Sequence, residues 1–391
     1  MDLPFGSGDP DAFADAPLFR ELQRVMATSS GPVNWELARQ IGIANALEGR
    51  DDPAPSDDDR RVFTEAVRVA ELHIARFTGL EAPNDVVEIK AVRRAEWVNA
   101  NTQSLRELLE PAAQKIASAM GDATREALGA DLPPEMQAMS GMFEQISPLL
   151  LGAQVGSVLG FLGQHVLGQY DIAIPRSGPG ALLFVVPNIA QFERDWSLDP
   201  TDFRTFVALH EVTHRFEFAR PWARERFGEL LRDFLETLKI DASAMQERLS
   251  SIDASDPEAM QALMGSEEGL FGSVLDDEQR IKLGRMQAFM AAAEGYGDHV
   301  MQALGRELLP SFGRIEEAMR RYREGEAGDP VFERLLGIEM KREQYVQGRA
   351  FCDFVVEQTD EATLTTMWDS VEAMPSLPEI EEPRLWLARS A

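Results

Sequence analysis

Hydrophobic residues recur at helical spacing along most of this chain. Residues 33–48 and 58–80 carry apolar side chains three and four positions apart, which is typical of amphipathic helices. The same spacing predicts three further helices, over 93–110, 111–128 and 135–168, the second of which begins at Pro111. After residue 225 the pattern stays helical to about residue 372, ahead of a tail with three prolines (Pro375, Pro378 and Pro383). We therefore expect a predominantly α-helical protein.

Strand patterns are confined to three short stretches. Residues 86–89 are strand-like, residues 170–175 alternate apolar and polar, and residues 182–187 form a continuous apolar run. A Gly/Pro turn at 176–180 separates the last two, so they are expected to form a hairpin. The predicted fold class is α+β, predominantly α-helical, with a small β-sheet or hairpin ahead of the next helix.

That next helix has strong start and stop signals. Asp199 is a candidate N-cap, Pro200 occupies the first helical position, and Pro221 is expected to end or kink the helix. Between them a stripe recurs at spacings of three and four, which places it on the buried face (Phe203, Phe206, Val207, His210 and His214).

The stripe contains two of the five histidines, in the pattern H-E-x-x-H formed by His210, Glu211 and His214. Positions i and i+4 share a helix face, so both imidazoles can bind one cation. Glu211 points aside, where it can contact a water on the metal instead of the metal itself. This arrangement is typical of zinc hydrolases; the alternative is a surface helix that happens to carry two histidines.

A catalytic zinc ion takes three protein ligands, and Glu294 is the predicted third. It lies among Ala, Met and Phe residues in a predicted helix over 281–304, where an unpaired carboxylate would be unusual. Asp298 follows one turn later and is expected to accept the second ring N–H of His210 or His214. Glu-x-x-x-Asp after H-E-x-x-H resembles the gluzincin pattern.

The remaining histidines are alternatives to Glu294. His73 and His165 fit better as core or boundary residues. His299 is a ligand, a proton donor or oxyanion partner lining the site, or a boundary histidine with no role in it. Glu294 follows the motif by 80 positions (294 − 214), which is longer than compact gluzincins use. The intervening stretch from 225 to 280 is therefore interpreted as an acidic insertion.

Glycines predict close helix packing at two places. Residues 148–167 are nearly uncharged, but they are short for a membrane span and contain polar side chains, so a buried helix crossed by another is preferred. Gly295 and Gly297 are expected to admit another helix near Glu294, and Gly305 is the expected C-cap. The first stretch carries glycines four positions apart (Gly152, Gly156 and Gly160).

Composition narrows the class of protein. The 391 residues carry 38 basic and 66 acidic side chains, a net charge of −28, which argues against nucleic acid or an anionic membrane as partner. The single cysteine, Cys352, allows no disulfide within the chain, and no signal peptide opens it, so a cytoplasmic location is expected. Residues 1–32 are expected to be loosely ordered, and residues 33–391 to form a single large domain.

Within that domain we expect four parts. A helical part spans 33–168, the strands and motif helix span 169–224, the acidic insertion spans 225–280, and a second helical part spans 281–391.

Several segments together resemble a bacterial family labelled as zincin-like, zinc-dependent metalloproteases, one branch of which is labelled as associated with deazaflavin-cofactor biosynthesis. The segments span most of the chain: 97–101 (WVNAN), 167–171 (LGQYD), 210–214 (HEVTH), Glu294-Gly295 with Val300-Met301, 344–348 (QYVQG) and Glu379-Ile380 with Pro383. The resemblance implies a zincin-like core, zinc, and hydrolase activity, with the motif residues and Glu294 as its site. Tyr296 stands where the family favours His, so a role at that position is not implied.

The residues and the resemblance together predict a metallopeptidase that hydrolyses peptide bonds in a peptide or protein substrate. A zinc-activated water would attack the carbonyl, with Glu211 as general base. Donors to the oxyanion would come from a short set of candidates (Tyr296, His299, Tyr345 and Arg349). Tyr345 and Arg349 share one helix face, which fits a helix packing and ion-pair face at least as well. The alternatives are a hydrolase acting on a small amide and an inactive zinc-binding scaffold used for interaction.

Overall fold

The computed structural model describes residues 31–128, 134–169, 181–237, 277–324 and 342–390. The expected loose N-terminal segment, the strand at 170–175 and most of the acidic insertion lie outside the described residues. The elements are α3 (Trp35–Leu47), α4 (Asp57–Thr78), β1 (Ile89–Val92), α5 (Arg94–Leu128), α6 (Pro134–His165), β2 (Leu182–Val185), α7 (Val186–Asp195), α8 (Pro200–Phe218), α9 (Pro221–Thr237), α12 (Asp277–Leu308), α13 (Phe312–Glu324), α15 (Arg342–Gln358), α16 (Glu361–Thr365), a 3₁₀ turn η2 (Thr366–Trp368), α17 (Leu377–Glu381) and α18 (Pro383–Ser390).

Helices dominate, as the hydrophobic spacing predicts, and local chemistry sets their ends. At the start of α4 the Ser56 hydroxyl accepts from the Asp59 N–H at 3.1 Å, and the Asp59 carboxylate accepts from the Ser56 N–H at 2.9 Å. Gly79 ends the same helix in the left-handed conformation with φ of 69°. Pro111 does not separate two helices, because α5 continues through it.

The sheet has two strands in the described residues, and they pair in parallel. Ile89 lies opposite Leu182 and Val92 opposite Val185, while α5 and α6 form the long connection that a parallel pair requires. Phe184 pairs with Ala91 on one side and makes a bridge to Gly168 on the other, so β2 is central at this point. The strand is shorter than the apolar run, because α7 begins at Val186.

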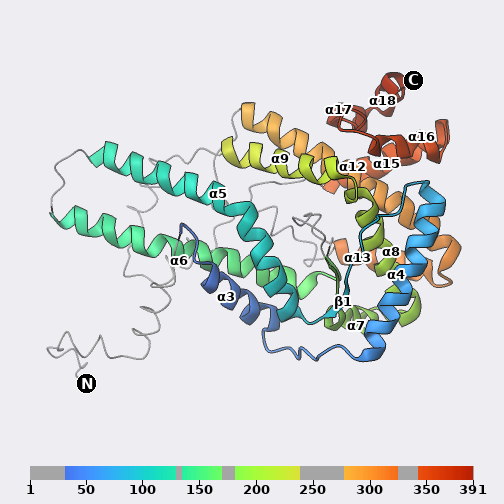
Figure 1. Cartoon of the computed structure of the whole chain (residues 1–391), viewed down its shortest axis with the longest axis horizontal. Coiled ribbons are helices and arrows are strands. Elements are labelled where there is room, and N and C mark those ends of the chain that lie inside the picture. The colour runs from blue at the N-terminus through green and yellow to red at the C-terminus, as the bar shows by residue number, and fades with distance from the viewer. Residues whose placement is uncertain (1–30, 129–133, 170–180, 238–276, 325–341, 391) are drawn as a thin grey trace.

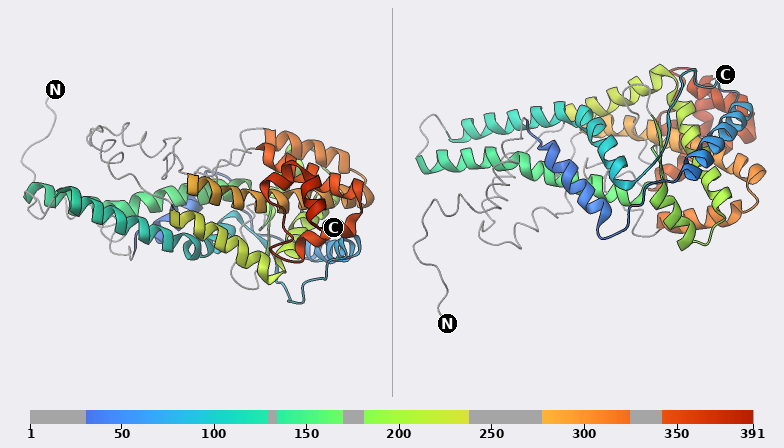
Figure 2. Two further views of the ribbon diagram at one scale, coloured as in Figure 1. Left: turned by 90° about the horizontal axis from the view of Figure 1, so that it is seen from above. Right: turned by 60° about the horizontal axis from the view of Figure 1, so that its bottom comes forward.

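Helices α5 and α6 lie side by side and project together away from the rest of the molecule (Figure 1), an arrangement that the two rotated views also show (Figure 2). Near the base of this pair, α3 crosses α6 at backbone contact. A Cβ atom on Gly156 would lie 2.7 Å from the Ala38 carbonyl oxygen, and one on Gly152 would lie 2.5 Å from the Asn34 carbonyl oxygen. The glycine spacing therefore serves a helix crossing, as expected; none of the described helices is long and apolar enough to span a membrane.

One expectation for the C-terminal half is wrong. Gly305 is not a C-cap, because α12 continues to Leu308; it is small because the Phe312 ring packs where its Cβ would be. The tail with three prolines contains two short helices, and Pro378 lies in the first turn of α17 while Pro383 begins α18.

Candidate metal centre

Helix α8, which packs against α4 and α12, carries the H-E-x-x-H motif. The Asp199 side chain accepts from the N–H groups of Thr201 at 2.9 Å and Asp202 at 3.1 Å, so it is the N-cap that the sequence predicts. Most residues from Phe203 to Phe218 are buried against α4, α12 and α9. The motif is therefore on a rigid element of the core.

The three predicted ligands lie on α8 and α12, which pack against each other (Figure 1). The rings of His210 and His214 have centroids 4.6 Å apart and planes at 86°. The Nε2 atom of His214 lies 4.0 Å from Oε2 of Glu294. Tertiary structure thus brings Glu294 to the motif across 80 positions of sequence (294 − 214).

His214 is oriented by a carboxylate on its own helix. Its Nδ1 atom lies 2.8 Å from Oε2 of Glu217, and both side chains are fully buried. Burial alone would lower the pKa of His214, but the Glu217 carboxylate, followed by those of Glu294 and Glu211, raises it to about 10. Without metal the two form a buried ion pair, and a metal at Nε2 would displace a proton.

Glu217 was not expected from the sequence. The predicted acceptor for a ligand histidine was Asp298, and for His214 that position is held by Glu217. The signal was present, because Glu217 follows His214 by three residues on the same helix face. An orienting role for Asp298 toward His210 stays a prediction.

Glu211 is buried and held by the backbone. The N–H of Gln169 donates to its Oε2 at 2.8 Å. A Cβ atom on Gly168 would lie 2.2 Å from its Oε1. Gly168 in turn accepts, through its carbonyl oxygen, a 3.1 Å hydrogen bond from Nε1 of Trp97. Trp97, Gly168 and Gln169, which lie in segments that carried a family resemblance but no assigned role, therefore meet at the predicted general base.

The small residues beside Glu294 allow close approach, as expected. At Gly295 a Cβ would lie 2.2 Å from the carbonyl carbon of Gly348, so α12 and α15 cross at backbone contact. At Gly297 a Cβ would lie 3.2 Å from Cε1 of His214. These glycines bring the helix that carries Glu294 against the imidazole.

Both ring nitrogens of His299 are hydrogen-bonded to carboxylates. Nδ1 lies 2.8 Å from Oδ1 of Asp353, and Nε2 lies 2.9 Å from Oε1 of Glu361. Burial lowers the pKa of His299, but these two hydrogen bonds outweigh it and raise the pKa. His299 therefore ties α12 to α15 and α16 in this structure, and its ring nitrogens are occupied by these contacts instead of facing the ligands.

The other oxyanion candidates are placed as follows. Tyr296 is buried, its hydroxyl lies 3.4 Å from that of Thr365, and burial raises its pKa. Arg349 donates from Nε to Asp353 at 3.2 Å. Tyr345 lies in the first turn of α15, and its side chain is outside the described residues. None of these contacts places a donor beside Glu211, so the oxyanion partner stays a prediction.

Two imidazoles and one carboxylate are donors that suit zinc. Ligands sharing a zinc ion at about 2.0–2.2 Å stand roughly 3–4 Å apart, and the His214–Glu294 spacing of 4.0 Å is at the upper end of that range. Within the described ranges, no three His, Cys, Asp or Glu side chains are already gathered into coordination geometry. The donor set therefore fits, and its side chains would have to close in to hold the ion.

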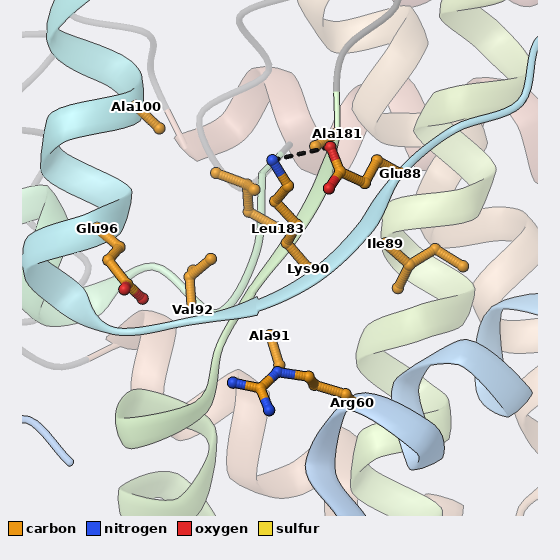
Figure 3. Close-up of a pocket in the computed structure, with 10 residues that line it drawn as sticks. All are labelled: Arg60, Glu88, Ile89, Lys90, Ala91, Val92, Glu96, Ala100, Ala181 and Leu183. Atoms are coloured by element: carbon orange, nitrogen blue, oxygen red, sulfur yellow. Dashed lines mark ion pairs between the residues drawn. The ribbon is translucent and has the colours of Figure 1, made fainter. Parts of the chain in front are cut away.

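A separate pocket lies over β1 and β2 (Figure 3). Its lining mixes charges of both signs, and Lys90 pairs with Glu88 at 2.8 Å. Arg60 of α4 and Glu96 of α5 complete its charged rim. None of the three predicted metal ligands lines it.

Comparison with known proteins covers most of the chain. A family model described as a zincin-like metallopeptidase matches residues 33–387, from before α3 to within α18. A crystal structure of a putative hydrolase with a novel fold from Chloroflexus aurantiacus is 32% identical, with a TM-score of 0.66, over 91% of this chain and 98% of that chain. No curated protein matches the sequence.

Proposed function

This chain belongs to the zincin-like metallopeptidase family, and from that premise we propose that it is a zinc-dependent peptidase with its centre between α8 and α12. The proposal rests mainly on one contact between residues far apart in the sequence: His214 Nε2 lies 4.0 Å from Glu294 Oε2. His210, one turn earlier on α8, supplies the second imidazole. The gluzincin-like ligand set of these three residues is part of the proposal.

When bound, zinc would supply a Lewis acid that makes water nucleophilic near neutral pH and stabilises developing negative charge. The remaining chemistry falls to protein groups. Glu211 is the base that takes a proton from the attacking water and passes it to the leaving amine. Glu217 holds His214 as the tautomer with its proton on Nδ1, which directs Nε2 toward Glu294.

Access to the centre is from the side of His210 and Glu294. His214 and Glu211 have no exposed surface, whereas His210 is partly exposed and the Glu294 side chain is 22% exposed. A peptide carbonyl approaching from that side would reach the ligands before it reaches the buried base. The substrate is proposed to be a peptide or protein; the deazaflavin association and a cytoplasmic location stay predictions.

A zinc-binding scaffold without hydrolytic activity is the second candidate. It is favoured by the complete burial of Glu211, because a general base must contact water during the reaction. A purely structural site has no use for that carboxylate, however, and the backbone contact from Gln169 keeps it close to the motif.

Metal content and activity separate these candidates. The purified protein is expected to hold roughly one zinc ion per chain and to lose it in His214→Ala and Glu294→Ala. Glu211→Gln should keep the zinc and lose cleavage of a set of internally quenched peptides. Full zinc retention by Glu294→Ala would contradict the ligand set. Zinc binding without cleavage by the wild type would favour the scaffold.

A further inference from the structure

We propose that Gly168 and Gln169 are positioning residues for Glu211, fixing its carboxylate through the backbone of the segment that follows α6. The inference rests on the proposed function, since it concerns the base of that site. It concerns residues to which neither the motif nor the family match assigns a role.

The contact is made by main-chain atoms. The Gln169 N–H donates to Glu211 Oε2 at 2.8 Å, and the carboxylate is fully buried. Because a backbone N–H has no side-chain rotamers of its own, it holds the carboxylate in a defined orientation.

The donor itself is fixed from two sides. On the α5 side, Trp97 donates to the Gly168 carbonyl at 3.1 Å, and the Gln169 side chain donates to Asn101 at 3.2 Å. On the sheet side, the Val185 N–H donates to the Leu167 carbonyl at 2.8 Å. The segment therefore cannot shift without breaking contacts to α5 and to β2.

Position 168 leaves no room for a side chain. A Cβ there would lie 2.2 Å from Oε1 and 2.3 Å from Cδ of Glu211, well inside van der Waals contact. The obstruction is the carboxylate itself. Any residue other than glycine would displace Glu211, so the glycine determines where the base sits.

The first test needs no activity. Gly168→Ala should destabilise the metal-free protein in urea unfolding, and most of that loss should vanish in a Glu211→Ala background, because the obstructing side chain is gone. Gly163→Ala is the matched control: its Cβ would meet Val98 at 2.9 Å and Ala46 at 3.0 Å, so its effect should be the same in both backgrounds. Strictly additive effects of Gly168→Ala and Glu211→Ala would overturn the proposal.

The second test uses the zinc-loaded enzyme. Gly168→Ala should lower kcat about 10- to 100-fold with zinc content retained and KM changed by less than about threefold, because the base is misplaced while the ligands are not. Trp97→Phe, which removes the donor to Gly168, should lower kcat in the same direction if Gly168→Ala does not fold. An unchanged kcat in the folded variants would overturn the proposal. Absence of peptidase activity in the wild type would instead refute the proposed function and leave the unfolding test valid.

Discussion

At the residue scale, the site depends on which polar groups hold the motif side chains. The sequence identifies His210, Glu211 and His214 by spacing alone, because positions on one helix face are fixed by helix geometry. It assigned the orienting carboxylate to Asp298, whereas for His214 the structure places Glu217 at 2.8 Å. Glu217 lies three residues after His214 on the same helix, so helix geometry alone brings its carboxylate to the imidazole, without a tertiary contact.

Glu217→Gln should weaken zinc binding by about 10- to 100-fold, because the amide keeps a hydrogen-bond acceptor but removes the charge that supports the basicity of His214. Competition with a fluorescent zinc chelator would measure the change. Glu225→Gln, on the exposed face of α9, is the control. The metal-free variant should also be less stable, because removing the carboxylate leaves the buried imidazole without its charge partner. Zinc affinity within twofold of wild type would argue against an orienting role.

At the element scale, glycine-lined helix crossings and buried hydrogen bonds between side chains determine how the helices pack. The α3–α6 crossing could be anticipated from glycines four residues apart, because that spacing forms one face of a helix. The hydrogen bonds of His299 could not be anticipated from the sequence, because Asp353 and Glu361 lie on two other helices. The isolated histidine was instead predicted to serve the active site.

Gly156→Ala should destabilise the protein by about 1–3 kcal/mol, because its Cβ would press on the Ala38 carbonyl and on Ile41 at 2.8 Å. Urea unfolding would measure the loss. Gly284→Ala on α12 meets no atom within 4 Å and should be neutral or stabilising, by up to about 1 kcal/mol. Equal effects at both positions would mean that the crossing is looser than described.

The stability contributed by His299 should depend on pH. Its pKa is raised on folding above the ordinary value of 6.5, so the protonated ring is favoured in the native state. The contribution is therefore fully present below pH 6.5 and is lost as pH rises through the folded pKa. His299→Gln should cost about 1–2 kcal/mol at pH 6 and less at high pH. Unfolding at several pH values, with His73→Gln as control, measures this; a cost that grows with pH would contradict it.

At the scale of the whole molecule, charge and topology dominate. The net charge of −28 creates self-repulsion in the compact state. The described ion pairs are mostly short-range contacts within single helices. The long-range effect should therefore be the repulsive one.

Screening that repulsion should raise the melting temperature by a few degrees between about 10 and 300 mM NaCl at neutral pH, because the Debye length falls well below the size of the molecule. Differential scanning calorimetry of the metal-free protein would measure it. A melting temperature that falls with salt would show that attractive ion pairs outweigh the net charge.

The sequence by itself determined the helices, the N-cap of α8, the shared face of His210 and His214 and the glycine faces, because each is set by residues within a few turns of one another. It also indicated Glu294, through a carboxylate in an apolar helix. Tertiary structure decided what lies far apart in the chain. It paired β2 with β1 in parallel, brought Gln169 to Glu211, and turned His299 toward Asp353 and Glu361. These contacts depend on how helices pack, and local periodicity carries no information about which faces meet.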